Sequence, residues 1–226
     1  MTQVKVRTPF PGVIHLVYPA QLTLARAFMR MQEFYESNIE GFRGEHFTRD
    51  EFKRAYAESK GTGTGWGEFT YYDDWGGFNV PGNIVNKFLK VFHPDHSEVT
   101  LVNLIKMHRK PRGEYYVIGT YAQDEWDTVS HELSHAFWYL HPHFQEMGQE
   151  LVDGLPRRFY RKAKKALLDL GYCEEVIDDE IMAYMGTSNM AEMVDVFETK
   201  NIPWKKALEF QEAFADYLEE VRDDQE

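Results

Sequence analysis

Residues Thr128 to Leu140 read TVSHELSHAFWYL, and this pattern predicts a buried helix. The apolar residues of this stretch recur at the spacing of one helix face, and they are Val129, Leu133, Ala136, Phe137 and Leu140. Pro142 follows at once and cannot continue the helical hydrogen-bond pattern, so we expect the helix to end near Leu140. One side of this helix should pack into a core, which leaves its polar side for a cleft.

The polar side carries a His-Glu-x-x-His pattern at residues 131 to 135. Residues four apart lie on one helix face, so the imidazoles of His131 and His135 can bind a single metal ion, which we predict to be Zn²⁺. Glu132 is one step round the helix, where its carboxylate could reach a water molecule and act as a general base. The alternative is a core helix whose two histidines only hydrogen-bond to neighbours. Burying three such groups without a function would be costly, and this favours the metal site.

Catalytic zinc usually takes three protein ligands and leaves a fourth position for water. His141 lies ten residues after His131, but the chain would have to turn sharply at Trp138 to bring it to the metal, and a bulky residue disfavours such a turn. Glu180 would come from a separate downstream helix, which the small Ala183 would let pack closely. We expect Glu180 as the third ligand and keep His141 as the alternative.

On His131, Glu132 and His135, and on Glu180 by position and context, the chain resembles gluzincin metallopeptidases, a group of zincins. The resemblance implies a zinc peptidase with Glu132 as its general base, and it does not extend to residues 1 to about 95. In that group an acidic residue four positions after the ligand glutamate orients a histidine ligand. Tyr184 stands at that position here, and we expect its hydroxyl to do this work. The group's Asn-Glu-x-x-Ser-Asp motif is not matched, since Asp179 precedes the glutamate.

In a second interpretation, the chain is similar to the metzincins instead of the gluzincins. The spacing from His131 to His141 is the one those enzymes use for their third ligand, although they have a glycine where this chain has Trp138. Residues 181–184, Ile-Met-Ala-Tyr, are also similar to the methionine turn of that group. This interpretation makes His141 the third ligand.

Composition limits the partners. The net charge of −12 argues against nucleic acid, because phosphate binding needs a basic surface. There is no apolar run long enough to span a membrane and no apolar N-terminal leader, and the only cysteine is Cys173, expected to be buried, so we expect a cytoplasmic protein. One basic run stands out, and it comprises Arg157, Arg158, Arg161, Lys162, Lys164 and Lys165. We interpret it as a solvated helix face, with an anionic partner as the alternative.

We expect one zincin-like domain over residues 1–226, with a mostly helical α+β fold and a small antiparallel sheet beside the zinc-binding helix. Residues 1–95 would form a helical part with a strand ending at Tyr18 and a long surface loop of glycines and aromatics at 61–82. Residues 98–107 and 115–121 would form a hairpin whose edge could pair with an extended substrate. The remaining helices are expected at 21–37, 48–59, 83–92, 144–154, 156–169, 174–186, 190–198 and 203–222.

The sequence thus predicts a zinc metallopeptidase that acts on a peptide or protein, and it leaves the oligomeric state open. Glu132 and Tyr184 are the predicted catalytic residues. Candidates for stabilising the oxyanion are Tyr184, Tyr71, Tyr72 and His143. Two alternatives stay open, which are a non-catalytic metal-binding protein with a closed ligand set and a zinc hydrolase of a non-peptide substrate.

Overall fold

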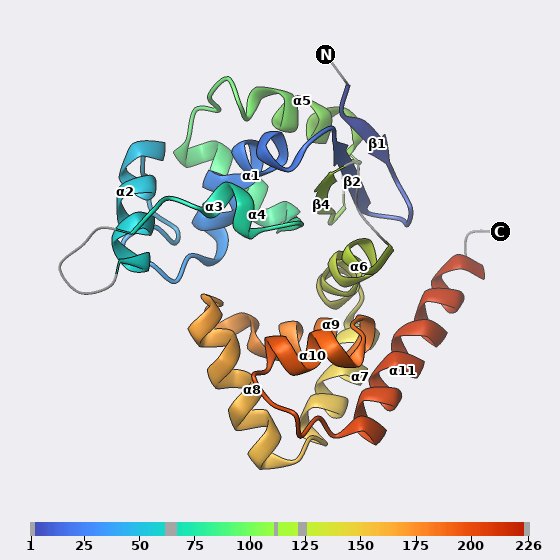
Figure 1. Ribbon diagram of the computed structural model, residues 1–226. Coiled ribbons are helices and arrows are strands. Elements are labelled where there is room, and N and C mark those ends of the chain that lie inside the picture. The colour runs from blue at the N-terminus through green and yellow to red at the C-terminus, as the bar shows by residue number, and fades with distance from the viewer. Residues whose placement is uncertain (1–2, 62–66, 111–112, 122–125, 224–226) are drawn as a thin grey trace. The chain divides into compact units, whose positions relative to one another are not determined.

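The computed structural model describes residues 3–61, 67–110, 113–121 and 126–223, without the side chains of residues 126 and 127. Contacts between Cα atoms divide the chain into two compact units, Met1–Asp124 and Glu125–Glu226, called the first and second unit below (Figure 1). The mostly helical α+β fold with a small sheet is confirmed. The single zincin-like domain over 1–226 stays a prediction.

The first unit contains a four-stranded sheet in the order β1-β2-β4-β3. These strands are β1 (Lys5–Arg7), β2 (Val13–Tyr18), β3 (Phe78–Pro81) and β4 (Tyr116–Tyr121). β2 and β4 are parallel and the other two pairs are antiparallel, so the sheet is mixed where an antiparallel one was expected. β4 has a partner strand on each side. β4, the strand just before the predicted zinc-binding helix, is therefore not an edge strand, a point that the sequence had left open.

Helix α1 (Gln21–Glu36) is central to the first unit, because it contacts β2, β3 and β4 as well as three helices. It approaches the sheet so closely that a Cβ atom on Gly119 of β4 would lie 2.5 Å from the ring of Phe28, which explains the glycine. The other helices are α2 (Arg49–Lys60), α3 (Tyr71–Asp74), α4 (Gly82–Val91) and α5 (Val99–His108). The expected capping box of Thr48 and Glu51 opens α2.

The strand predicted at 98–107 falls on helix α5 (Val99–His108), so this strand and its hairpin are wrong. The β-branched residues of this segment favour a strand by composition. Burial follows the helical period instead, because Leu101, Val102 and Ile105 are buried while Val99 is exposed. Residues 111 and 112, in the predicted turn, lie outside the described residues.

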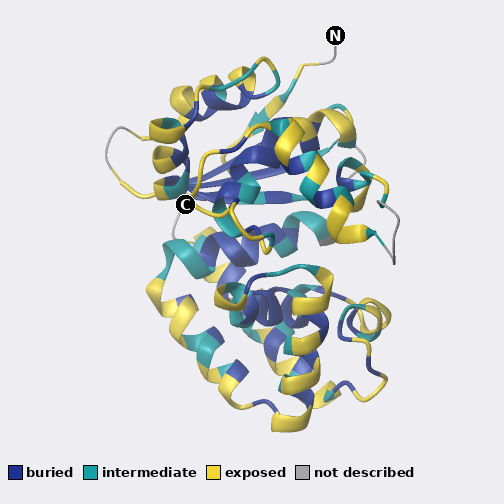
Figure 2. Ribbon diagram, turned by 90° about the vertical axis from the view of Figure 1, so that its left-hand side faces the viewer, coloured by how far each residue is buried: buried dark blue, intermediate teal, exposed yellow. Residues whose placement is uncertain are grey.

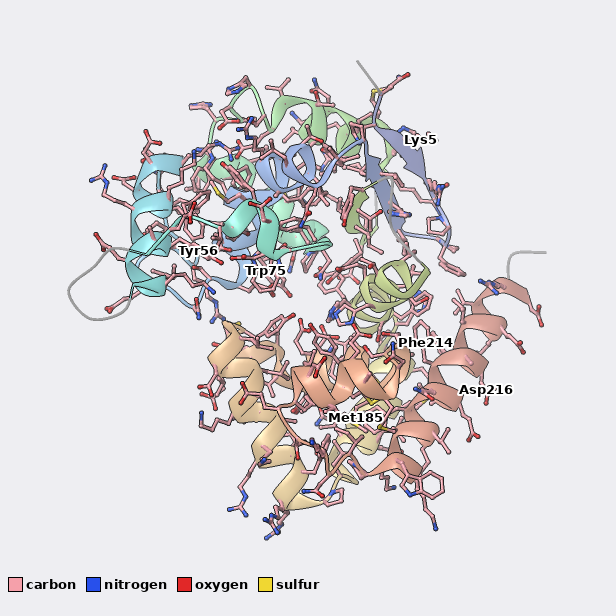
Figure 3. All side chains as sticks on the ribbon, in the orientation of Figure 1. Lys5, Tyr56, Trp75, Met185, Phe214 and Asp216 are labelled. Carbon is pink, nitrogen blue, oxygen red and sulfur yellow. The ribbon has the colours of Figure 1, made fainter. Side chains whose placement is uncertain are left out.

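The segment at 61–82 is only in part a surface loop. Residues 62–66 lie outside the described residues, but the rest contains α3 and β3. Tyr71 is 1% exposed and its ring packs against those of Phe52, Tyr56 and Phe78, while Trp75 is half-buried nearby (Figure 3). Tyr71 and Phe78 of this segment therefore belong to the core of the first unit, and Phe69, Tyr72 and Trp75 pack against it, which corrects the loop assignment.

The described residues of the second unit contain helices and loops but no strand. It contains α6 (Trp126–Leu140), α7 (Pro142–Asp153), α8 (Arg157–Leu170), the 3₁₀ turn η1 (Glu174–Val176), α9 (Ile177–Thr187), α10 (Met190–Val196) and α11 (Trp204–Asp223). These helices agree with the sequence prediction to within a few residues. Cys173 is buried, as expected.

Helix α9 lies at the centre of the second unit, because it contacts α6, α7, α8 and α11. Its residues Ile181, Met182, Ala183 and Met185 are fully buried, and Met185 lies in the interior with Phe214 of α11 (Figure 3). Figure 2 shows that the buried residues lie inside and the exposed ones on the outer helix faces. A central helix of this kind can hold a polar side chain against α6. No helix in the described ranges combines the length and the apolar character that crossing a membrane requires.

Candidate metal centre

Helix α6 places His131 and His135 side by side. It runs without a break through Trp138 to Leu140, as the straight-helix prediction required. The Nε2 atoms of the two histidines are 3.2 Å apart and their ring centroids 4.9 Å apart. His135 is 2% exposed, whereas the side chain of His131 is 17% exposed, so the pair lies at the boundary between the core and solvent.

Helix α9 brings Glu180 to the same point. Its Oε1 lies 3.5 Å from Nε2 of His135, and its Oε2 lies 3.7 Å from Nε2 of His131. Ala183 is completely buried, as is Ala136 on the facing helix, and α6 and α9 are in extensive contact. The predicted close packing of a second helix that carries the glutamate is thus present.

One ligand atom from each of His131, His135 and Glu180 lies within 4.8 Å of the other two, a group able to hold a metal ion. In tetrahedral zinc sites with bonds of about 2.0–2.1 Å, neighbouring ligand atoms are about 3.3 Å apart, close to the separations seen here. Oε2 of Glu180 is also buried without a hydrogen-bond donor among the described residues. Such an orphaned carboxylate oxygen is costly unless a cation satisfies it. The donor set therefore fits a metal ion.

Asp179, the residue before the ligand glutamate, pairs with His135. Its Oδ1 lies 2.9 Å from Nδ1 of His135, the ring nitrogen that faces away from the group. Burial alone would lower the pKa of His135, but the carboxylates of Asp179 and Glu180 outweigh burial and raise it well above its usual range. Burial also raises the pKa of Asp179, against the opposing effect of His135. In the sequence, Asp179 appears only as a mismatch to the Asn-Glu-x-x-Ser-Asp motif. Its position beside Glu180 was the available signal for this role.

Glu132 is buried beside the two histidines, with 6% of its surface exposed. Burial is the largest effect on the pKa of Tyr184, which it raises, and the Glu132 carboxylate raises it further. The same carboxylate adds to the acidic groups that raise the pKa of His135. The charge of Glu132 therefore acts within the group, although Glu132 is not one of its ligands.

Tyr184 contacts the group by its ring and not by its hydroxyl. The ring centroid lies 4.5 Å from that of His131, and the hydroxyl is 2.9 Å from the hydroxyl of Tyr172. The contact with a ring nitrogen of a histidine that we expected from Tyr184 comes from Asp179, whose Oδ1 lies 2.9 Å from Nδ1 of His135. Its assignment as a catalytic residue stays a prediction.

Two of the other oxyanion candidates, Tyr71 and Tyr72, belong to the first unit, and the third, His143, belongs to the second. Tyr71 is buried in the first unit, hydrogen-bonded to Glu33, and Tyr72 belongs to the same aromatic cluster. His143 is on α7 and lines a groove with residues of α11.

His141 is not a member of the group. Its Nδ1 lies 2.9 Å from the hydroxyl of Tyr217 on α11, and its ring stacks on Phe137 at 5.3 Å. Burial lowers its pKa, with Glu220 acting in the opposite direction. His141 is therefore engaged in packing α6 and α7 against α11, and the structure supports Glu180 over His141 as the third ligand.

Comparison of the chain with protein-family models, with curated proteins and with solved structures gave no match.

Proposed function

We propose that this protein is a zinc-dependent peptidase with a gluzincin-like site. The observation that carries the proposal is the convergence of His131, His135 and Glu180, with Glu132 buried on the same helix directly after His131. Within the described part of the chain, no fourth His, Cys, Asp or Glu joins the three. An open fourth position is what distinguishes catalytic from structural zinc sites.

His131, His135 and Glu180 would hold the ion. Bound zinc supplies Lewis acidity, which polarises a carbonyl group and activates water. Glu132 takes a proton from the attacking water and passes it to the leaving amine. Asp179 keeps the ring of His135 in a fixed orientation, and the ring of Tyr184 packs on His131.

The geometry bears on the two alternatives. A closed, non-catalytic set would need a further ligand, and the sequence offered His141 for this place. Its contact with Tyr217 removes that ligand, which favours an open site. A zinc hydrolase of a non-peptide substrate would use the same residues, so only substrates can distinguish it.

The test is turnover of a mixed peptide library by the zinc-loaded full chain, compared with Glu132→Gln. We expect Glu132→Gln to bind zinc as the wild type does and to lose activity by about 10²–10⁴-fold, because the proton acceptor is gone. Glu146→Gln on α7, an exposed glutamate, is the matched control and should keep full activity. Peptide cleavage that survives Glu132→Gln would contradict the mechanism. Cleavage of ester or amide substrates alone, with peptides left intact, would favour the non-peptide alternative.

A further inference from the structure

Two residues of the basic run, Arg157 and Arg161 of α8, line a cavity that the proposed metal centre does not use. This cavity has a volume of about 470 Å³, within the range of small-ligand sites. The residues that line it come from the end of α7, the loop after it and the first turns of α8, and they are Val152, Asp153, Leu155, Arg157, Tyr160 and Arg161. It is formed within the second unit.

Two arginines of the cavity are available to a ligand. Arg157 and Arg161 are one helical turn apart and exposed, and neither has a carboxylate partner in the described part of the chain. This is unexpected by charge, since the second unit has 23 Asp and Glu against 10 Lys and Arg. Two lysines of the same run do find partners, Lys164 with Glu174 and Lys165 with Asp169. A guanidinium pair left open beside a cavity suits a carboxylate or phosphate.

The remaining residues select among anions. Asp153 places a carboxylate in the same cavity, and its Oδ1 accepts a hydrogen bond from Gln149 at 3.3 Å. A site for inorganic phosphate would not include that negative charge, which favours a ligand that also carries a cation. Val152 and Leu155 are buried and give the cavity an apolar wall. The ligand that matches has a carboxylate, an ammonium group and an apolar side chain.

We propose that this cavity binds a free α-amino acid or a short peptide with an apolar side chain. Arg157 and Arg161 bind its carboxylate, Asp153 binds its ammonium group, and Val152 and Leu155 contact its side chain. The proposal does not depend on the proposed peptidase activity. If that activity holds, the ligand belongs to the class of its products.

The cavity is linked to the helix that carries Glu180. The hydroxyl of Tyr160, in the cavity wall, donates a hydrogen bond to Oδ1 of Asp178 at 2.8 Å. Asp178 lies in the first turn of α9, directly before Asp179 and Glu180. A ligand in the cavity would therefore lie beside Tyr160, which hydrogen-bonds to the turn of α9 that carries Glu180.

The experiment is a titration of the metal-free full chain with L-leucine, followed by calorimetry or by NMR of the backbone amides. We expect saturable binding at one site. L-leucinamide, which lacks the carboxylate, and N-acetyl-L-leucine, which lacks the ammonium group, should each bind at least about tenfold more weakly. Arg157→Gln and Arg161→Gln should weaken the binding of L-leucine to a similar degree. Asp153→Asn should weaken the binding of L-leucine but not that of N-acetyl-L-leucine.

Two controls separate this site from other causes. Arg158→Gln removes the same charge from the same helix outside the cavity and should leave binding unchanged. Glu180→Ala should bind L-leucine as the wild type does, because the metal group is not involved. Far-UV circular dichroism checks that each variant is folded.

Three results would overturn the proposal. The first is no saturable binding of L-leucine by the wild type. The second is binding of phosphate or N-acetyl-L-leucine as tight as that of L-leucine, which would mean a plain anion site. The third is an equal loss in Arg158→Gln and Arg161→Gln, which would mean that only the overall charge matters.

Discussion

Nδ1 of His135 lies 2.9 Å from Oδ1 of Asp179, so the residue directly before one member of the candidate metal group, Glu180, contacts another. A carboxylate can only accept a hydrogen bond, so this contact keeps a proton on Nδ1. It leaves Nε2 of His135 to face His131 at 3.2 Å and Glu180 at 3.5 Å. Asp179 and Glu180, adjacent on α9, thus each contact one ring nitrogen of His135.

Removal of this contact should weaken metal binding. We expect Asp179→Ala to lower zinc affinity by about 10–100-fold, because outer-shell partners of ligand histidines have effects of that size. Asp179→Asn should lose less, since an amide oxygen can still accept from Nδ1. Competition with a chromogenic chelator measures the affinity. Asp178→Asn is the control, as Asp178 lies in the same helix turn but bonds to Tyr160. An equal loss in that variant would assign the effect to helix charge alone.

Metal content distinguishes the two candidate third ligands. Elemental analysis of the purified protein should find about one zinc per chain, with a chelator-treated sample as the blank. Glu180→Ala should lose this zinc, and His141→Ala should keep it, because His141 bonds to Tyr217 outside the group. The reverse dependence would make the site metzincin-like. No zinc in any sample would leave the five-residue motif without a metal.

What the sequence could predict of this site depends on distance along the chain. The imidazoles of His131 and His135 are related by one helical turn, and local periodicity is enough to pair them. Glu180 was predicted from its position on a separate downstream helix and from its small neighbour Ala183, which lets that helix pack closely. The role of Asp179 could not be read, because it requires the position of a ring 44 residues earlier. Side-chain direction across two packed helices is a tertiary property.

The same limit explains the errors in the first unit. Residues 98–107 have strand-like composition, and a helix forms because the core takes Leu101, Val102 and Ile105 on one side while Glu98 is held by arginines from other helices. Gly-rich residues 67–82 read as a loop, but Tyr71 is buried by rings distant in sequence. In both segments tertiary contacts override local propensity.

His15 should make the first unit acid-sensitive. It is buried on β2, with Nε2 2.7 Å from Oγ1 of Thr120, and burial together with the nearby Arg7 lowers its pKa from 6.5 to about 4. The unfolded chain then binds more protons than the folded chain between these pH values, so stability falls as pH drops through this range. The loss should approach about 2–4 kcal/mol.

The measurement for His15 is urea unfolding at pH 7 and pH 4.5, compared with His15→Gln. Glutamine can still bond to Thr120 but does not titrate, so the difference in the free energy of unfolding between the two pH values should shrink in this variant. The carboxylates titrate in both proteins, so their contribution to the pH dependence cancels in the comparison. An unchanged difference would show that His15 does not contribute.

A buried ion pair should be the most sensitive polar contact of the first unit. Glu98 is 0% exposed, and it accepts hydrogen bonds from Nε of Arg30 at 2.7 Å and from Nη2 of Arg49 at 3.1 Å. The Arg30 guanidinium, itself buried, also lies 4.9 Å from the ring centroid of Phe92. Glu98→Ala would leave Arg30 without its principal partner, at a cost of about 3–5 kcal/mol. Urea unfolding measures this loss.

Lys165→Gln removes an exposed pair with Asp169 and should leave the transition unchanged. Equal effects of the two substitutions would mean that burial does not strengthen the Arg30–Glu98 contact.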